Sequence, residues 1–115
     1  MKLFRLSEIP DARRGHFLGG ILSGRSIHHG SMSYKKPGAV THTEGRHVHD
    51  DDEVFVILQG TGEMEIDGVR HPIGVGDVVV AEAGEDHHLR SSADDPVINL
   101  WFHLADEPNP EQKAD

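Results

Sequence analysis

Residues 47–60 decide the fold, and they read HVHDDDEVFVILQG. Residues 54–58 form an unbroken apolar run of β-branched, aromatic and leucine side chains, which is typical of a buried strand. Glycine and threonine turn residues end the run. Because alternate residues of a strand share a face, Glu53, Phe55 and Ile57 point one way and the remaining residues point the other. Both faces of this strand therefore need cover.

Short strands separated by turns continue on both sides of this run. The Asp67-Gly68 dipeptide between residues 63–66 and 69–71 is typical of a tight β-hairpin. We expect further strands at residues 31–34, 78–80 and 97–104. About seven or eight short strands, with no helical period between them, predict an all-β fold, either a sandwich or a barrel.

The length of 115 residues fits one domain. We expect residues 1–25 to form an N-terminal arm or an edge strand, because their glycines and proline argue against a long helix. Residues 26–105 would form the barrel, and residues 106–115 a frayed, mostly polar tail. The apolar content of 36% supports one thin core, so we expect a homodimer that covers the outer face of the 54–58 run. The alternative is that residues 1–25 fold over that face and leave a monomer.

Charge and composition exclude several functions. The 11 Lys and Arg against 20 Asp and Glu leave a formal net charge of −9, which repels phosphate backbones, so we expect no nucleic-acid partner. No stretch approaches the roughly 20 apolar residues of a membrane span, and the N-terminus lacks the apolar run of a signal peptide. There is no cysteine, hence no disulfide framework. We expect a cytoplasmic protein with no membrane partner.

Histidine, the commonest metal-ligating side chain, occurs 10 times, and spacing selects among these residues. His47, His49 and Glu53 have the same strand parity. Two imidazoles and a carboxylate on one face suit divalent Mn, Fe, Co, Ni, Cu or Zn. These residues could instead be solvated, but Phe55 and Ile57 continue the same face into a core, where an unpaired carboxylate is costly. A metal site is the favoured interpretation.

The same residues resemble the first motif of the cupin superfamily. In that motif His-x-His is followed by three or four residues, a Glu, six further residues and a Gly. Here these positions are His47, His49, Glu53 and Gly60. The family usually places a Gly six residues before the first His, and this chain has Thr41 there. That departure concerns the shape of a turn, and the ligand positions are intact.

A second stretch resembles the second cupin motif, which runs Gly, five residues, Pro-x-Gly, two residues, His, three residues, Asn. Gly76, Gly84 and His87 match at the required spacing. Glu82 stands in place of the Pro and Ser91 in place of the Asn. Two motifs in the right order are far more specific than a lone His-x-His.

The resemblance covers roughly residues 30–105 and implies a metal-binding monocupin with a double-stranded β-helix, or jelly-roll barrel. It also implies that His47, His49, Glu53 and His87 hold one divalent transition metal per chain. His88 lies outside the motif register, and we expect it to be a surface histidine.

Other side chains are candidates for supporting roles. Trp101 and His103 share one side of the last strand, which would line the barrel if the opposite, aliphatic side packs elsewhere. Alternatively, Trp101 is a core residue and His103 a satisfied polar one. We name His103 and Tyr34 as candidate general acid/base residues. The acidic run 50–52 could hydrogen-bond to metal-bound imidazoles, or it could be a solvated turn.

Four protein ligands on a six-coordinate ion leave two positions for substrate, water or dioxygen. We therefore expect a small metalloenzyme acting on an oxygen-bearing small molecule, by dioxygenase-type chemistry or by metal-assisted isomerase or lyase chemistry. The alternative is a non-catalytic binding or sensing barrel with a structural metal. The intact ligand set favours catalysis, and the fold alone does not identify the substrate.

Overall fold

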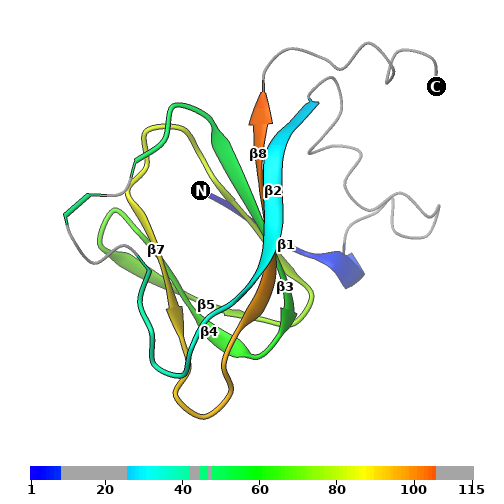
Figure 1. Cartoon of the computed structure of the whole chain (residues 1–115), viewed down its shortest axis with the longest axis vertical. Coiled ribbons are helices and arrows are strands. Elements are labelled where there is room, and N and C mark those ends of the chain that lie inside the picture. The colour runs from blue at the N-terminus through cyan, green and yellow to red at the C-terminus, as the bar shows by residue number, and fades with distance from the viewer. Residues whose placement is uncertain (9–25, 42–44, 47, 106–115) are drawn as a thin grey trace.

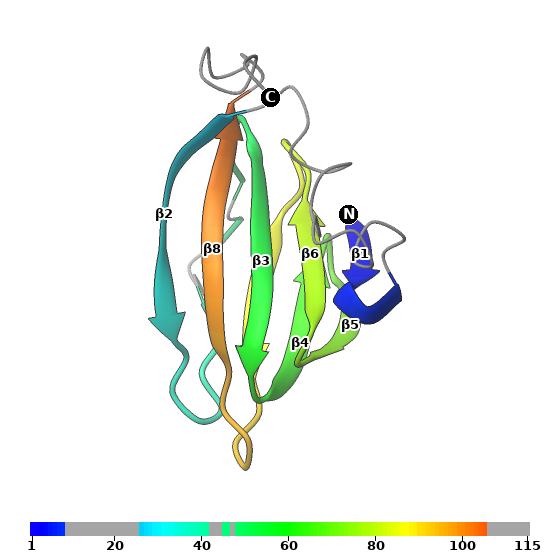
Figure 2. The ribbon, with the colours of Figure 1, turned by 90° about the vertical axis from the view of Figure 1, so that its right-hand side faces the viewer.

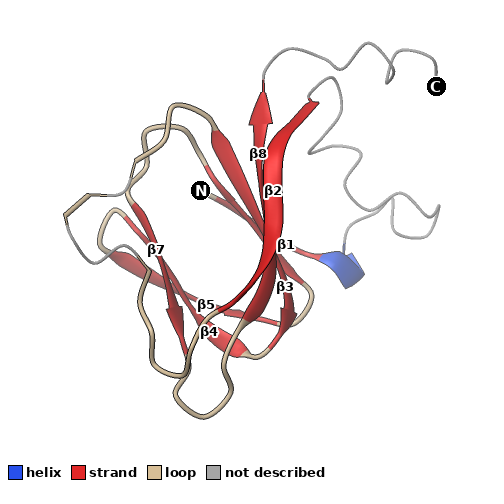
Figure 3. Cartoon of the chain, in the orientation of Figure 1, coloured by secondary structure: helices blue, strands red, loops and turns tan. Residues whose placement is uncertain are grey.

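The computed structural model describes residues 1–8, 26–41, 45–46 and 48–105, and within them the chain is an all-β jelly roll (Figure 1, Figure 3). The elements in chain order are β1 (Lys2–Arg5), the short 3-10 helix η1 (Leu6–Glu8), β2 (Ser26–Tyr34), β3 (Asp52–Gln59), β4 (Thr61–Ile66), β5 (Val69–Gly74), β6 (Asp77–Ala81), β7 (His87–Ser91) and β8 (Ile98–Ala105). None of the described residues belongs to a helix that is long and apolar enough to cross a membrane.

Two antiparallel sheets make up the barrel. The larger has the strand order β1-β6-β3-β8-β2, and the smaller has the order β5-β4-β7. Figure 1 shows the smaller sheet across from β2, β8 and β3, and Figure 2 shows the larger sheet broadside with β3 in its middle. The strand that carries the apolar run 54–58 therefore lies at the centre of the larger sheet, paired with β6 and β8.

The turns explain why these strands pair as they do. Asp67 and Gly68 between β4 and β5 have positive φ angles of 47° and 84°, as a two-residue hairpin turn of type I′ requires. Gly60, between β3 and β4, also has a positive φ of 84°, and a Cβ there would overlap the carbonyl of Pro96. The predicted hairpin and the predicted all-β barrel are both confirmed.

The inner face of β3 packs between the two sheets. Phe55 and Ile57 of β3 belong to this inner cluster, and the partly buried Trp101 packs against it. The buried members are Phe55, Ile57, Met64, Ile66, Ile73, Val79, Ala81, Leu89 and Val97. Because Phe55 and Ile57 have the parity of Glu53, the carboxylate lies on the same, inward side.

The outer face of β3 carries a second cluster. Its buried members are Val54, Val56, Val78, Val80 and Leu104, and Phe4 of β1 and Leu6 of η1 pack against them together with Leu100 and Phe102. Val54 is fully buried within the single chain, whereas Leu58 further along β3 is 42% exposed. Part of the cover expected from a second subunit thus comes from the chain's own N-terminal strand. The homodimer remains a prediction, and the chain leaves less apolar surface exposed for its interface than the sequence indicated.

The expectation that His88 is a surface histidine is wrong. Its exposed fraction is 8%, its Nδ1 lies 3.0 Å from the carbonyl oxygen of Thr41, and its Nε2 lies 2.9 Å from Oδ1 of Asp86. The segment that ends at Thr41 runs antiparallel to β7, with a bridge between Val40 and Arg90. That segment therefore lies beside β7, and the sequence carries no local signal of this long-range pairing.

Candidate metal centre

Glu53 lies near the start of β3, on the inner face of the larger sheet. It is aligned with Ala81 of β6 on one side and with His103 of β8 on the other. Its exposed fraction is only 6%. A carboxylate at this depth is costly unless it is paired or hydrogen-bonded, so its partners define the site.

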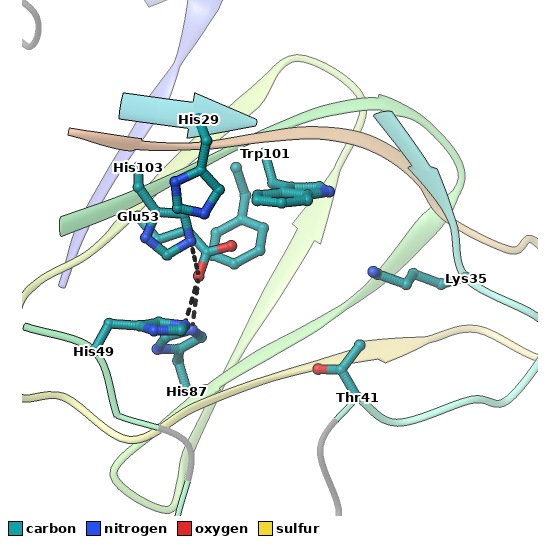
Figure 4. A pocket seen from close by; sticks show the side chains of 9 residues that line it. His29, Lys35, Thr41, His49, Glu53, His87, Trp101 and His103 are labelled. Atoms are coloured by element: carbon teal, nitrogen blue, oxygen red, sulfur yellow. Dashed lines mark hydrogen bonds and ion pairs between the residues drawn. The ribbon is translucent and has the colours of Figure 1, made fainter. Parts of the chain in front are cut away.

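Three imidazoles converge on one oxygen of this carboxylate (Figure 4). The distances to Oε1 of Glu53 are 3.0 Å from Nε2 of His87, 3.3 Å from Nε2 of His49 and 3.6 Å from Nε2 of His103. His87 comes from the smaller sheet, His103 from the larger sheet, and His49 from the segment before β3. The cluster therefore joins both sheets around one buried carboxylate.

The cluster forms part of the wall of a cavity between the sheets. Its volume is about 360 Å³, which lies in the ~300–1,000 Å³ range of small-molecule sites. The lining residues are His29, Lys35, Thr41, His49, Glu53, Phe55, His87, Trp101 and His103. Apolar rings and polar groups thus share the wall, as in sites that bind a small polar molecule.

A carboxylate outside the cluster orients His103. Nδ1 of His103 lies 2.7 Å from Oδ1 of Asp51, so with Nδ1–H donating to that oxygen the free Nε2 faces Glu53. The His103 ring also stacks on the ring of His29, with centroids 4.4 Å apart and an interplanar angle of 8°. The acidic run was expected either to hydrogen-bond to metal-bound imidazoles or to form a solvated turn. Asp51 does contact an imidazole, but that imidazole belongs to His103, which is not one of the predicted metal ligands.

The pKa values of both His49 and Glu53 are lowered in this cluster. Burial lowers the pKa of His49, and the negative charge of Glu53 offsets only part of that effect. Burial acts to raise the pKa of Glu53, but the hydrogen bond with His87 and the charges of the nearby histidines outweigh it and hold the pKa below its ordinary value. A metal ligand needs a neutral imidazole or an ionised carboxylate, and a lowered pKa favours each of these forms.

The donor set fits a divalent transition metal. The ligand atoms of His49, Glu53 and His103 all lie within 4.8 Å of one another, and imidazole with carboxylate is the donor set that suits Mn, Fe, Co, Ni, Cu or Zn. His87 is bonded to the same oxygen of Glu53. The described residues therefore form a His-His-Glu cluster that is compatible with a metal site.

The structure brings together three of the four predicted ligands. His49, Glu53 and His87 meet at the cluster, while His47 lies outside the described residues. Of the two candidate acid/base residues, His103 lines the cavity and Tyr34 does not. Tyr34 is 57% exposed, and it has the opposite strand parity from Lys35, which does line the cavity. Tyr34 is therefore not placed to serve this site.

Sequence reasoning missed three lining residues. The signal for His29 is strand parity: extending the alternation of the 31–34 segment backwards places His29 on the same face as Ser31 and Ser33. Lys35 and Thr41 both lie beyond the end of that strand, and only the fold brings them to the cavity. Trp101 lines the cavity and also packs against the inner core cluster.

The comparisons with known proteins agree with this geometry. A family model described as a cupin domain matches residues 35–103. An oxalate-binding protein from Thermotoga maritima is 29% identical, and the match covers 76% of this chain and 81% of that protein. The chain therefore belongs to the cupin domain family.

Solved structures support the same fold. A cupin protein from Bacteroides fragilis has a TM-score of 0.59 at 24% identity, with 72% of this chain and 67% of that chain covered. A protein with a double-stranded β-helix domain from Klebsiella pneumoniae also has a TM-score of 0.59, at 19% identity, with 74% and 78% covered. At these identities the likeness establishes a cupin barrel, and function has to be argued from the site.

Proposed function

We propose that this chain is a small metalloenzyme that holds one divalent transition metal at Glu53 and acts on an oxygen-bearing small molecule. The convergence of three imidazole nitrogens on one buried carboxylate oxygen, at 3.0, 3.3 and 3.6 Å, carries the proposal. An ion pair serving stability alone would not need three imidazoles. A cavity of about 360 Å³ beside the cluster supplies room for a small substrate.

The proposed ligands are His47, His49, Glu53 and His87. The bound ion would supply Lewis-acid or dioxygen chemistry at positions that the protein leaves open. His103 is the proposed proton-transfer residue, because Asp51 fixes its ring so that Nε2 faces the cavity. Trp101 and Phe55 would exclude water from the apolar part of the wall.

A second candidate is non-catalytic binding of a small acid. The relative from Thermotoga maritima is called an oxalate-binding protein, and it shares 29% identity with this chain. A barrel that holds a metal and a small acid without turnover would use the same cluster. The two candidates differ in whether a bound molecule is converted.

Turnover assays on metal-loaded protein distinguish these candidates. The panel contains catechols, diketones and thiols for dioxygen uptake, and oxalate for binding. We expect metal-dependent conversion of at least one compound, and its loss in Glu53→Gln. Saturable oxalate binding without conversion of any compound would favour the binding barrel, and a Glu53→Gln variant that turns over normally would contradict both.

A further inference from the structure

The cavity has two chemically different sides. Figure 4 shows the histidines and Glu53 on one side and the side chains of Lys35 and Thr41 on the other, both with their polar atoms directed inward. The first side offers metal-ligating nitrogens and a carboxylate oxygen. The second side offers an ammonium group and a hydroxyl group, which are hydrogen-bond donors.

The backbone of Lys35 is fixed on both sides of its Cα. Its N–H donates to the carbonyl of Val97 at 2.8 Å, and its carbonyl accepts from the hydroxyl of Ser91 at 3.1 Å. The same Ser91 oxygen accepts the N–H of Val97 at 2.9 Å. Ser91 is buried, so this network holds the start of the lysine side chain at the cavity wall. Ser91 stands where the second motif usually has Asn.

The ammonium group of Lys35 lacks an ion-pair partner among the residues that the structure describes. The side chain is half-buried. Burial lowers the pKa of Lys35, and the negative charge of Glu53 counteracts this effect only in part. A half-buried ammonium group without an ion-pair partner in the described part of the chain, whose charge Glu53 offsets only from across the cavity, gains from an anion that enters the cavity.

Thr41 adds a second donor on the same side. Its Oγ1 accepts the backbone N–H of Leu89 at 2.9 Å. The oxygen is thus held in place while its own hydroxyl hydrogen stays available to donate. Thr41 occupies the position at which the first motif usually has Gly, so a typical motif would provide no hydroxyl here.

We propose that Lys35 and Thr41 form an anion subsite, and that the natural ligand is a small acid with two anionic groups, one for this subsite and one for the metal side. The net charge of the cavity agrees with a ligand that carries two negative charges. Among the nine described lining residues, the carboxylate of Glu53 and the ammonium of Lys35 cancel, so a divalent ion would leave two positive charges. This inference rests on the proposed metal site and specifies its ligand.

The test is calorimetric binding of malonate, oxalate and acetate to metal-loaded protein. Lys35→Met is compared with Lys36→Met, because Lys36 is the exposed neighbour and does not line the cavity. We expect Lys35→Met to weaken binding of the two dicarboxylates about 10- to 100-fold, as loss of a charged hydrogen bond does. Acetate, which has one carboxylate, should change less than about threefold, and Lys36→Met should match the wild type.

Thr41 is tested with a pair of variants. Thr41→Ser keeps the hydroxyl and should bind dicarboxylates like the wild type, whereas Thr41→Val removes it and should bind them about 5- to 10-fold more weakly. Both variants are checked by circular dichroism, because Thr41 also accepts the Leu89 N–H. Equal affinity of both variants would remove Thr41 from the subsite.

Metal content is measured on every sample, which separates this inference from the proposed function. Wild-type protein that holds metal but binds acetate as tightly as malonate would overturn the subsite alone. Protein that holds no metal would contradict the proposed function, and malonate-induced thermal shifts of wild type and Lys35→Met would then still test the subsite. Unchanged dicarboxylate affinity in Lys35→Met would overturn it in either case.

Discussion

The two faces of β3 bury different kinds of side chain, and the outer face is less completely covered because Leu58 is 42% exposed. The inner face begins with Glu53, 6% exposed, and continues into Phe55 and Ile57. The outer face presents Val54 and Val56 to an entirely apolar cluster. On the inner face, polar atoms are arranged around one carboxylate oxygen.

This difference indicates how a barrel of 115 residues combines stability with a site. Burying apolar surface on the outer face stabilises the fold by about 25 cal/mol per Å². The inner face contributes less to stability, because burying its polar groups costs free energy unless each finds a partner. Strand parity separates the two roles, so substitutions one residue apart should have different consequences.

The largest effect is expected at the metal ligands. His49→Ala should weaken metal affinity about 100-fold or more, because loss of a partner behind a ligand already costs about 10- to 100-fold. His88→Ala is the control, since it removes an imidazole whose nitrogens face Thr41 and Asp86 instead of Glu53. Competition titration with a chromogenic chelator measures both, and equal metal affinity in the two variants would contradict the assignment of His49.

The next largest effect concerns the outer face. Leu104 is fully buried in the outer cluster, and Leu104→Ala should lower the free energy of unfolding by about 3 kcal/mol. Urea denaturation measures this change. Metal content of the folded variant should stay at the wild-type level. A variant that keeps its stability but loses its metal would contradict the assignment of stability to the outer face and metal binding to the inner face.

His103, one residue before Leu104, provides the inner counterpart. His103→Gln should lower the free energy of unfolding by about 1 kcal/mol, since it loses the 2.7 Å contact with Asp51 but leaves no large cavity. As a proton-transfer residue it should be dispensable for metal binding. Loss of metal in this variant would instead make His103 a ligand, in keeping with its place within 4.8 Å of His49 and Glu53.

The smallest effect concerns self-association. Leu58 on β3 is 42% exposed, and Met32 on β2 is 60% exposed. We expect the wild type to be a homodimer by light scattering at micromolar concentration. Leu58→Ser should weaken that dimer by less than about 1 kcal/mol, because only the exposed part of the side chain is left for an interface to bury. A particle of one chain mass would show that the chain covers its own outer face sufficiently.

Local sequence signals predicted most of the fold. The Asp67-Gly68 turn and the strand at 53–59 could be identified because hairpin chemistry and apolar runs are encoded in neighbouring residues. Two motifs with fixed spacing predicted that Glu53 and His87 would meet, although 34 residues separate them.

What the sequence could not show depends on long-range register. His29 reaches the site because β2 pairs with β8, where it lies opposite His103. The burial of His88 depends on the segment ending at Thr41, which pairs beside β7. No local pattern reports such pairings, so the side chains they bring together became visible only in the fold.

Elemental analysis of metal-replete wild-type protein measures the proposed ion itself. Protein is exposed in turn to Mn, Fe, Co, Ni, Cu and Zn, desalted and measured against its own concentration, with Glu53→Gln treated in parallel. We expect one divalent ion per chain for the wild type with at least one of these metals, and a large loss in Glu53→Gln. Wild-type protein that retains none of the six ions, or a variant that retains the same amount, would contradict it.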